Sequence, residues 1–424
     1  MDWLRSANEY CFGYGSPTTL GVIRIGVGFL ALVNWLMIGV DWDSWFSERG
    51  FIPNWLGSLW FGVRTPYPYF LSTWLPQGLP RLNLLSGITD PRINMAFYAV
   101  VTISALFTCI GLGTRYAAFV LAIGTVTLHD RNGAILHGGD TVLRMLVIYI
   151  AVSPSGQACS LDRLIDLWKE RISRSPVLIS IWGQRLIAYN TALIYFTTLW
   201  LKWDGDKWRF PKMNATYYPG RLAEFYRFPL PDFMRSGWMA RVTTIGTLIT
   251  EFCLGTLVFF PPARKYVLIG GVLMHSYIEY SMNIPLFSFL MIVSYLSFYQ
   301  GEEVTGWAQR MGMRLRKWHV RVSLPQGMRL QPRALAFFDA MDPFKMVTYL
   351  PGEGPNWTAE KFDGQPIGVS KAIGSRCIGG WVFLWLPGMS RRLLEKGLEA
   401  IPTEAQRAEK SEPKPAGQFA RKGR

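Results

Sequence analysis

Charged side chains and histidines are scarce in this chain of 424 residues, whereas apolar side chains are abundant. Asp, Glu, Lys and Arg make up 17% of the residues, which is well below the roughly 25% usual for soluble domains. Only four residues are histidine, half of the residues are hydrophobic, and 18 are tryptophan. Several stretches reach the roughly 20 mostly apolar residues that a helix needs to cross a bilayer. This composition argues against a soluble protein and indicates a polytopic membrane protein.

Paired cysteines and the usual short catalytic motifs are also missing. None of the five cysteines forms CxxC or a zinc-finger arrangement with histidine, which argues against a disulfide framework or a thiol relay. The sequence has no Walker loop, no dinucleotide glycine motif after a strand and no GxSxG elbow. His129, Asp130 and His137 match no compact metal signature such as HExxH, so we expect no metal.

The net charge of +15 and the isoelectric point of about 9.7 have two interpretations. In a soluble protein they would suggest nucleic acid as the partner. In a membrane protein they indicate cytoplasmic loops rich in Lys and Arg, which set the orientation. No nucleic-acid recognition module accompanies the charge. We therefore expect the lipid bilayer, and no nucleic acid, as the partner, and the sequence points to no particular protein partner.

Eight apolar stretches predict an all-α polytopic membrane bundle with about eight spans. No apolar segment precedes the first span, so we expect this span to serve as its own targeting signal. Basic residues follow spans four, six and eight, which predicts a multi-pass inner-membrane protein with both termini in the cytoplasm. The predicted spans are residues 19–40, 93–112, 115–129, 141–154, 181–202, 239–260, 265–281 and 283–300.

Three regions follow one another along the chain. Residues 1–300 form the predicted transmembrane domain. Residues 301–400 predict a small cytoplasmic α+β domain, in which "RALAFFDAMDPFKMVTYL" (333–350) is expected to form a strand, a turn and a further element. Residues 401–424 are polar and basic and predict a disordered tail.

Polar side chains near the outer membrane face are candidates for a functional site. Lys202 ends span five in "YFTTLWLKWDGDKW", His129 and His137 flank a polar hairpin, and His275 lies toward the outer end of span seven. Polar groups at membrane depth usually face a bundle interior and mark a site, because exposing them to lipid is costly. Each group also has a structural interpretation. Lys202 can extend to the interface, and His275 can be a hydrogen-bonded core residue. His137 precedes Gly138-Gly139-Asp140, which can form a turn and an N-cap for span four.

Several motifs resemble the horizontally transferred transmembrane (HTTM) family, which includes the vitamin-K-dependent γ-carboxylases. They cover roughly residues 15–300 in the family's order and are "ERGFIP", "GLGTRYAAFVLA", "DRNGAILHGGDTVLRMLVIYIAVSPSGQACSLDR", "YFTTLWLKWDGDKW" and "HSYIEYSMNIPLFSFLM". The resemblance implies that Lys202 is the base that deprotonates a hydroquinone. It also places His137 near the histidine that supports the intermediate, and His275 on the family's later histidine. A quinol such as menaquinol or vitamin K hydroquinone is the implied cofactor.

The resemblance therefore predicts an integral membrane enzyme of the vitamin-K-dependent carboxylase-like family. Its reaction would be hydroquinone-coupled proton abstraction, followed by oxygenation or carboxylation, at an outward-facing cavity. We expect Lys202, His137 and His275 to be catalytic. The alternative is a non-catalytic membrane scaffold or transporter component, in which Lys202 and His137 do not share a cavity. The residues expected to bind the cofactor are Asp140, which would also hold the hairpin, Arg144, Trp203 and Asn283.

Two further residues and one further segment leave alternatives open. Arg144 and Glu251 lie within predicted spans and are either structural partners or cavity liners, which the sequence does not decide. The segment "FFDAMDPFK" resembles the start of a DCC-type thiol–disulfide oxidoreductase fold, whose motif is YDGxCxxC. Asp342 and Lys345 stand where the two cysteines of that motif would be. The resemblance therefore implies a degenerate domain without a thiol couple.

Overall fold

The computed structural model describes residues 2–61, 64–65, 79–80, 82–172, 177–223, 225–377 and 387–401. The chain divides into two compact units. Unit 1 comprises Met1–Arg163 and Pro176–Val304, and unit 2 comprises Leu164–Ser175 and Thr305–Arg424. The predicted disordered tail lies outside the described residues, apart from Ile401.

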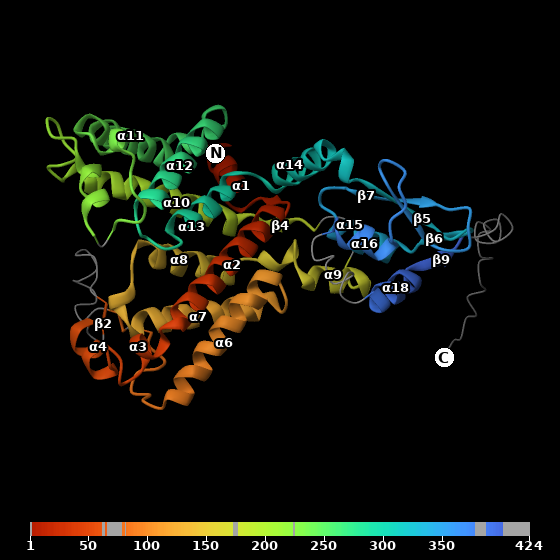
Figure 1. Cartoon of the computed structure of the whole chain (residues 1–424), viewed down its shortest axis with the longest axis horizontal. Coiled ribbons are helices and arrows are strands. Elements are labelled where there is room, and N and C mark those ends of the chain that lie inside the picture. Colours follow the sequence, from red (N-terminus) through yellow and green to blue (C-terminus); the bar gives the residue numbers. More distant parts are fainter. Residues whose placement is uncertain are drawn as a thin grey trace, which may run out of the picture. The chain divides into compact units, whose positions relative to one another are not determined.

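Unit 1 consists mainly of helices, whose ends follow local sequence signals (Figure 1). The helix Pro91–Ile110 is an example. Its N-cap is Asp90, whose side chain accepts a hydrogen bond from the backbone N–H of Arg92 at 2.8 Å, and it ends at Gly111, which has a φ of +71°. The helices are α1 (Asp2–Phe12), α2 (Thr18–Val40), α3 (Trp42–Phe46), α4 (Asn54–Phe61), α6 (Pro91–Ile110), α7 (Thr114–Arg131), α8 (Gly138–Val152), α10 (Trp182–Trp203), α11 (Gly237–Gly255), α12 (Pro261–Ser281) and α13 (Phe287–Tyr295). A further helix, α9 (Leu161–Trp168), begins in unit 1 and belongs to unit 2 from Leu164 on.

Short strands accompany these helices. β1 (Tyr14–Gly15) pairs antiparallel with β4 (Ile179–Ser180), and β2 (Arg64–Thr65) pairs antiparallel with β3 (Leu79–Pro80). The first pair ties the N-terminal segment to the start of α10.

Each of the eight predicted spans overlaps a different helix, in chain order α2, α6, α7, α8, α10, α11, α12 and α13. Among the described residues, α2 and α6 are the two helices that are long and apolar enough to cross a membrane on length and composition alone. The other six include helices with buried polar residues, such as His129 in α7, Asp140 in α8 and Glu251 in α11, which lower their hydropathy. The mostly helical fold is thus established, whereas the number of eight spans stays a prediction.

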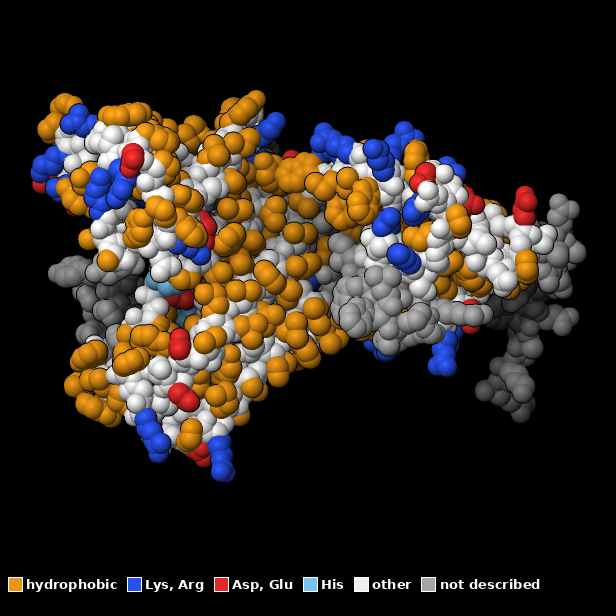
Figure 2. Space-filling model, in the orientation of Figure 1, with side chains coloured by type: hydrophobic (Ala, Val, Ile, Leu, Met, Phe, Trp, Pro, Cys, Tyr) orange, Lys and Arg blue, Asp and Glu red, His pale blue; other side chains and the backbone are white. Residues whose placement is uncertain are grey.

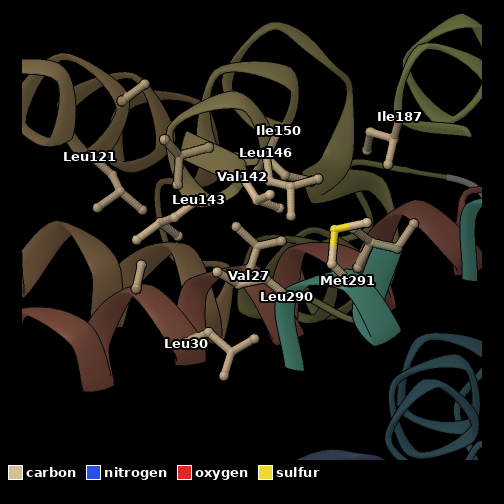
Figure 3. Packing of buried hydrophobic residues seen from close by; sticks show 14 of the residues in the cluster. Val27, Leu30, Leu121, Val142, Leu143, Leu146, Ile150, Ile187, Leu290 and Met291 are labelled. Atoms are coloured by element: carbon tan, nitrogen blue, oxygen red, sulfur yellow. The ribbon is translucent and has the colours of Figure 1, made fainter. Parts of the chain in front are cut away.

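The hydrophobic core of unit 1 is built around α2. Its buried residues recur every three or four positions, as expected for one face of a helix. Figure 3 shows Val27 of α2 close to side chains of α8 and α13, among them Val142 and Leu290. A Cβ atom on Gly28 would lie 2.6 Å from the backbone nitrogen of Cys109, so this glycine allows α2 to pack closely against α6. The fully buried apolar residues of α2 include Leu20, Ile23, Val27, Ala31 and Trp35.

The outer surface of unit 1 is unusually apolar. Hydrophobic side chains cover the middle of the face seen in Figure 2, and charged side chains gather at its edges. Such a continuous apolar surface is rare on soluble monomers and is the surface that a lipid bilayer would cover. Exposed examples on the long helices are Phe29, Leu36, Ile103, Phe107, Ile249 and Leu273.

Unit 2 has a mixed α/β fold with its own hydrophobic core. Its three-stranded sheet has the order β7-β5-β8, in which β5 is parallel to β7 and antiparallel to β8, and β6 pairs antiparallel with β9. The elements are α14 (Gly301–Arg314), which begins in unit 1, β5 (Val320–Leu324), β6 (Met328–Leu330), α15 (Pro332–Met341), β7 (Val347–Pro351), β8 (Thr358–Lys361), α16 (Val369–Gly374), α18 (Pro387–Lys396) and β9 (Leu398–Ala400).

The strand predicted at the start of segment 333–350 is wrong, because these residues form α15. Pro332 occupies the first turn, and Ala334, Phe338 and Met341 recur at helical spacing and are buried. The strand of this segment is β7, which comes after the helix. Asp342 therefore follows a helix and accepts the backbone N–H of Val347 at 2.8 Å.

Cys377 is the buried cysteine of unit 2 among the described residues. Burial raises the pKa of its thiol to about 12, so it is a protonated core residue at neutral pH.

Candidate functional site

Lys202, at the end of α10, forms an ion pair with Glu251 of α11. The Lys202 side chain is 25% exposed and the Glu251 side chain is 7% exposed, so the pair lies at the border between the interior and the surface. The ammonium also lies 5.2 Å from the centre of the Trp208 ring. The lysine therefore joins two helices.

The two acidic residues that follow Lys202 in the sequence have other partners. Asp204 accepts a hydrogen bond from Arg209 at 2.7 Å, and Asp206 accepts one from Lys212 at 3.0 Å. The hydrogen bond and charge of Lys212 lower the pKa of Asp206, which stays ionised. The carboxylate that pairs with Lys202 is thus that of Glu251, which lies 49 residues later in the sequence.

A buried chain of hydrogen bonds lies close to this ion pair. The hydroxyl of Tyr195 contacts Nε2 of His275 at 2.7 Å and the hydroxyl of Tyr295 at 2.6 Å. The three side chains are 3%, 1% and 4% exposed in that order. Tyr195 is seven residues before Lys202, which places both on one face of α10. We call Lys202, Glu251, Tyr195, His275 and Tyr295 the polar network.

The polar network is connected by charge as well as by hydrogen bonds. The ammonium of Lys202 interacts electrostatically with His275, and the carboxylate of Glu251 interacts with both tyrosines. Two of its buried polar atoms, Oε2 of Glu251 and Nδ1 of His275, have no hydrogen-bond partner among the described residues. A buried polar atom without a partner costs free energy, so these two atoms distinguish the network from an ordinary packed core.

The sequence predicts an N-cap for span four within Gly138-Gly139-Asp140, and the structure places this N-cap at His137, directly before that turn. Its Nδ1 accepts the backbone N–H of Gly139 at 2.9 Å, while Asp140 accepts the backbone N–H of His137 at 2.9 Å. This reciprocal arrangement is a capping box. Nε2 of His137 lies 3.4 Å from the Asp140 carboxylate, and the imidazole is 31% exposed. The N-cap of α8 is therefore His137, and Asp140 completes the capping box as its third helical residue.

Other polar residues surround this cap, and we call them the hairpin cluster. Nε2 of His129 lies 3.7 Å from Asp140, and neither ring nitrogen of His129 has a hydrogen-bond partner among the described residues. Arg144 contacts Asp130 at 2.9 Å. In the part of the chain that the structure describes, no group of three His, Cys, Asp or Glu side chains is placed to hold a metal ion. The hairpin cluster comprises His129, Asp130, His137, Asp140 and Arg144.

Two residues next to the hairpin cluster, Arg131 and Asn132, hold the aromatic loop that follows α2. Arg131, at the end of α7, donates to the carbonyls of Ile52 and Phe46 and pairs with Glu48 at 3.3 Å. Asn132 donates to the carbonyl of Trp45 at 2.8 Å. Residues 62–63, 66–78 and 81 of this loop lie outside the described residues.

Phe287 lies between the polar network and the hairpin cluster. Its ring is 5.4 Å from the His275 ring, and a Cβ atom on Gly138 would lie 4.0 Å from it. Among the described residues, no hydrogen bond or ion pair joins His137 to Lys202 or to His275. The structure thus brings Lys202 and His275 together and places His137 in the adjoining cluster.

The four residues predicted to bind a cofactor lie in different surroundings. Asp140 and Arg144 belong to the hairpin cluster. Asn283 is exposed, and its backbone N–H donates to the carbonyl of Phe225 at 2.6 Å. Trp203 lines an apolar groove of about 430 Å³ between α10 and α11, together with Phe196, Leu199, Trp200, Leu248, Ile249 and Phe252. Their contact with a cofactor stays a prediction.

A comparison with models of protein families shows to which family the chain belongs. The model of the HTTM domain matches residues 79–302, which is slightly more than half of the chain. The chain belongs to the HTTM family. Together with the apolar helices α2 and α6, this makes it a membrane protein. The matched region of the HTTM domain contains the whole polar network and the hairpin cluster. Comparisons with curated proteins and with solved structures gave no match.

Three residues of the polar network were not among the predicted site residues. From the sequence, Glu251 is either a structural partner or a cavity liner, and Tyr195 and Tyr295 are not among the candidates. The available signals were weak: Glu251 is the one acidic residue in α11, and Tyr195 lies two helical turns before Lys202. Neither signal identifies the partner on another helix.

Proposed function

We propose that this HTTM protein is a membrane enzyme that removes a proton from a lipophilic hydroquinone at the polar network. One observation supports the proposal above all. A lysine, a carboxylate, a histidine and two tyrosines converge from α10, α11, α12 and α13 inside an otherwise apolar bundle. Ionisable groups at such a position are costly and are typical of proton-transfer sites.

The ion pair explains how Lys202 would act as a base. An ammonium that donates to a carboxylate is already protonated and accepts no further proton. Transfer of one proton from Lys202 to Glu251 yields a neutral amine and a carboxylic acid without changing the total charge. Partial burial favours this exchange, because two neutral groups cost less to keep from water than two charges. The neutral amine is then able to accept a proton.

The tyrosines and the histidine give that proton a path into the interior. Each hydroxyl can donate one hydrogen bond and accept another, so the chain from Tyr295 through Tyr195 to His275 can reverse its direction when a proton enters or leaves. In this proposal Lys202 and Glu251 take the proton, and the His275 chain compensates for the change of charge.

The residues around the polar network suit a hydroquinone. Oε2 of Glu251 and Nδ1 of His275 are free to bind a polar ring substituent, and the groove that Trp203 lines is suited to a long apolar tail. A bound hydroquinone supplies two electrons and an ionisable hydroxyl group. The resemblance to the vitamin-K-dependent carboxylases favours oxygenation or carboxylation as the following step.

The location of the site is part of the proposal. We place the polar network toward the outer face of the inner membrane and both termini in the cytoplasm, following the distribution of basic residues. His137 remains a predicted catalytic residue, although its ring already caps α8. The other interpretation of His137 is that it only caps α8, and the turnover of His137→Asn separates the two.

The proposal is tested with the full chain in lipid nanodiscs supplied with chemically reduced menaquinone and oxygen. Oxygen uptake and the oxidised products are followed by an oxygen electrode and mass spectrometry. The wild type should turn over the hydroquinone faster than protein-free nanodiscs, and Lys202→Met should lose roughly a hundredfold or more of that rate. Lys207→Met is the matched control and should keep it, since Lys207 lies over the Tyr218 ring at 4.9 Å, outside the network. If the wild type turns over the hydroquinone no faster than protein-free nanodiscs do, the proposal is contradicted and the alternative of a non-catalytic scaffold remains.

A further inference from the structure

Unit 2 contains a strongly basic segment. Residues 305–321, "TGWAQRMGMRLRKWHVR", include five Lys or Arg and no Asp or Glu. The segment consists of the end of α14, a short turn of 3-10 helix at Arg316–Trp318 and the start of β5. Among the described residues, Arg310, Arg314, Arg316 and Lys317 form no ion pair, and all four are exposed. Their charge is therefore available to a partner.

Large apolar side chains accompany these cations at the surface. Met311 is 57% exposed, Met313 is 61% exposed and Trp318 is 56% exposed. Arg310, Met311 and Arg314 lie on one side of α14, because residues three and four apart are neighbours on a helix. Figure 2 shows Lys and Arg side chains beside hydrophobic ones where Figure 1 draws α14.

The opposite side of this segment is fixed to unit 2. Gly312 is buried, and a Cβ atom on it would lie 1.8 Å from the carbonyl oxygen of Phe344. Nε2 of His319 donates a hydrogen bond to the carbonyl of Gly312 at 2.9 Å. The cations and the exposed apolar side chains are thus presented on a rigid support, and we call Arg310, Met311, Met313, Arg314, Arg316, Lys317 and Trp318 the basic surface.

We infer that the basic surface binds the headgroups of an anionic phospholipid membrane and holds unit 2 against it. The combination of unpaired cations with exposed Met and Trp is typical of segments that lie in a membrane interface. The chain also brings the surface to the bilayer, since α14 begins directly after the last predicted span, residues 283–300, and rises only about 20 Å over its length. Each basic residue near an anionic leaflet strengthens binding about fivefold.

A nucleic acid is the other polyanion that such cations could bind. It leaves the exposed methionines without a role, because a phosphate backbone attracts charge and offers no apolar phase. The membrane accounts for both kinds of side chain and is therefore the partner that the surface favours.

Hydrogen exchange of the full chain in nanodiscs tests the inference. Nanodiscs of phosphatidylcholine alone are compared with nanodiscs that contain one third phosphatidylglycerol. The amides of segment 305–321 should exchange at least about tenfold more slowly in the anionic discs, and added salt should remove much of the difference. The fourfold variant Arg310→Ser, Arg314→Ser, Arg316→Ser, Lys317→Ser should exchange at the same rate in both.

A matched variant controls for net charge. Lys361→Ser, Lys371→Ser, Arg392→Ser and Lys396→Ser remove four positive charges from other exposed or partly exposed positions of unit 2, and this variant should behave as the wild type does. Equal exchange of the wild type in both lipid compositions would overturn the inference. So would protection of the segment by a DNA or RNA oligonucleotide without any effect of phosphatidylglycerol.

Discussion

Lys202 and Glu251 have to be considered together, because each is the ion-pair partner of the other and Glu251 is almost inaccessible to water. Lys202→Met should destabilise the protein by about 2 kcal/mol, since it leaves a carboxylate in the interior without its cation. The double variant Lys202→Met, Glu251→Gln should recover most of this loss, because both remaining side chains are neutral and similar in size. Thermal unfolding in detergent measures both effects. Equal destabilisation by the single and the double variant would show that the pair does not act as a unit.

The hydroxyl of Tyr195 contacts both His275 and the Tyr295 hydroxyl in the buried part of the polar network. Tyr195→Phe should cost about 1–2 kcal/mol of stability, because it leaves His275 and the Tyr295 hydroxyl without their buried partner. Tyr189→Phe on the same helix is the control. Its side chain is 41% exposed, so its loss should change the unfolding midpoint little. The hypothesis of a buried chain would fail if the two variants unfolded at the same temperature.

At the scale of the element, His137 stabilises α8 by capping its N-terminus. His137→Ala should lose about 1 kcal/mol of stability because it removes the N-cap, whereas His137→Asn should keep it, since asparagine caps helices well. Unfolding measurements on both variants test the cap. Turnover of His137→Asn then tests chemistry: an inactive but stable variant supports the predicted catalytic role, and a fully active one limits His137 to capping.

Helix positions were predictable from the sequence because long apolar runs with caps and glycine stops specify them locally. The His137-Gly138-Gly139-Asp140 turn is one such local signal. The sequence predicts a strand at the start of segment 333–350, but the spacing of Phe338 and Met341 and the Pro at the start of α15 specify a helix. Periodicity is the better guide there than residue type.

The candidate site was predictable only in part. Lys202 and His275 stood out because polar groups are rare in apolar helices, and the structure connects them. Their partners Glu251, Tyr195 and Tyr295 come from α11, α10 and α13, and the choice between Asp204, Asp206 and Glu251 as the partner of Lys202 depends on tertiary packing. A sequence motif carries no information about which distant helix faces the lysine.

At the scale of the whole molecule, the topology of unit 1 leads to a further prediction. If α10 crosses the bilayer, a reporter inserted after Arg171 and one inserted after Asp206 should lie on opposite sides, since 22 residues span about 33 Å. The Lys and Arg residues before α10 should place the first reporter in the cytoplasm. Fusions to a fluorescent protein and to alkaline phosphatase measure this. Both reporters active on one side would show that α10 does not span.

The most direct test of the proposed chemistry is the hydroquinone turnover of the double variant Lys202→Met, Glu251→Gln in nanodiscs. Its unfolding midpoint should lie near that of the wild type, while its oxidation of reduced menaquinone should fall to the rate of protein-free nanodiscs. A double variant that is folded and still turns over the hydroquinone at the wild-type rate would contradict the assignment of Lys202 and Glu251 as the site of proton transfer.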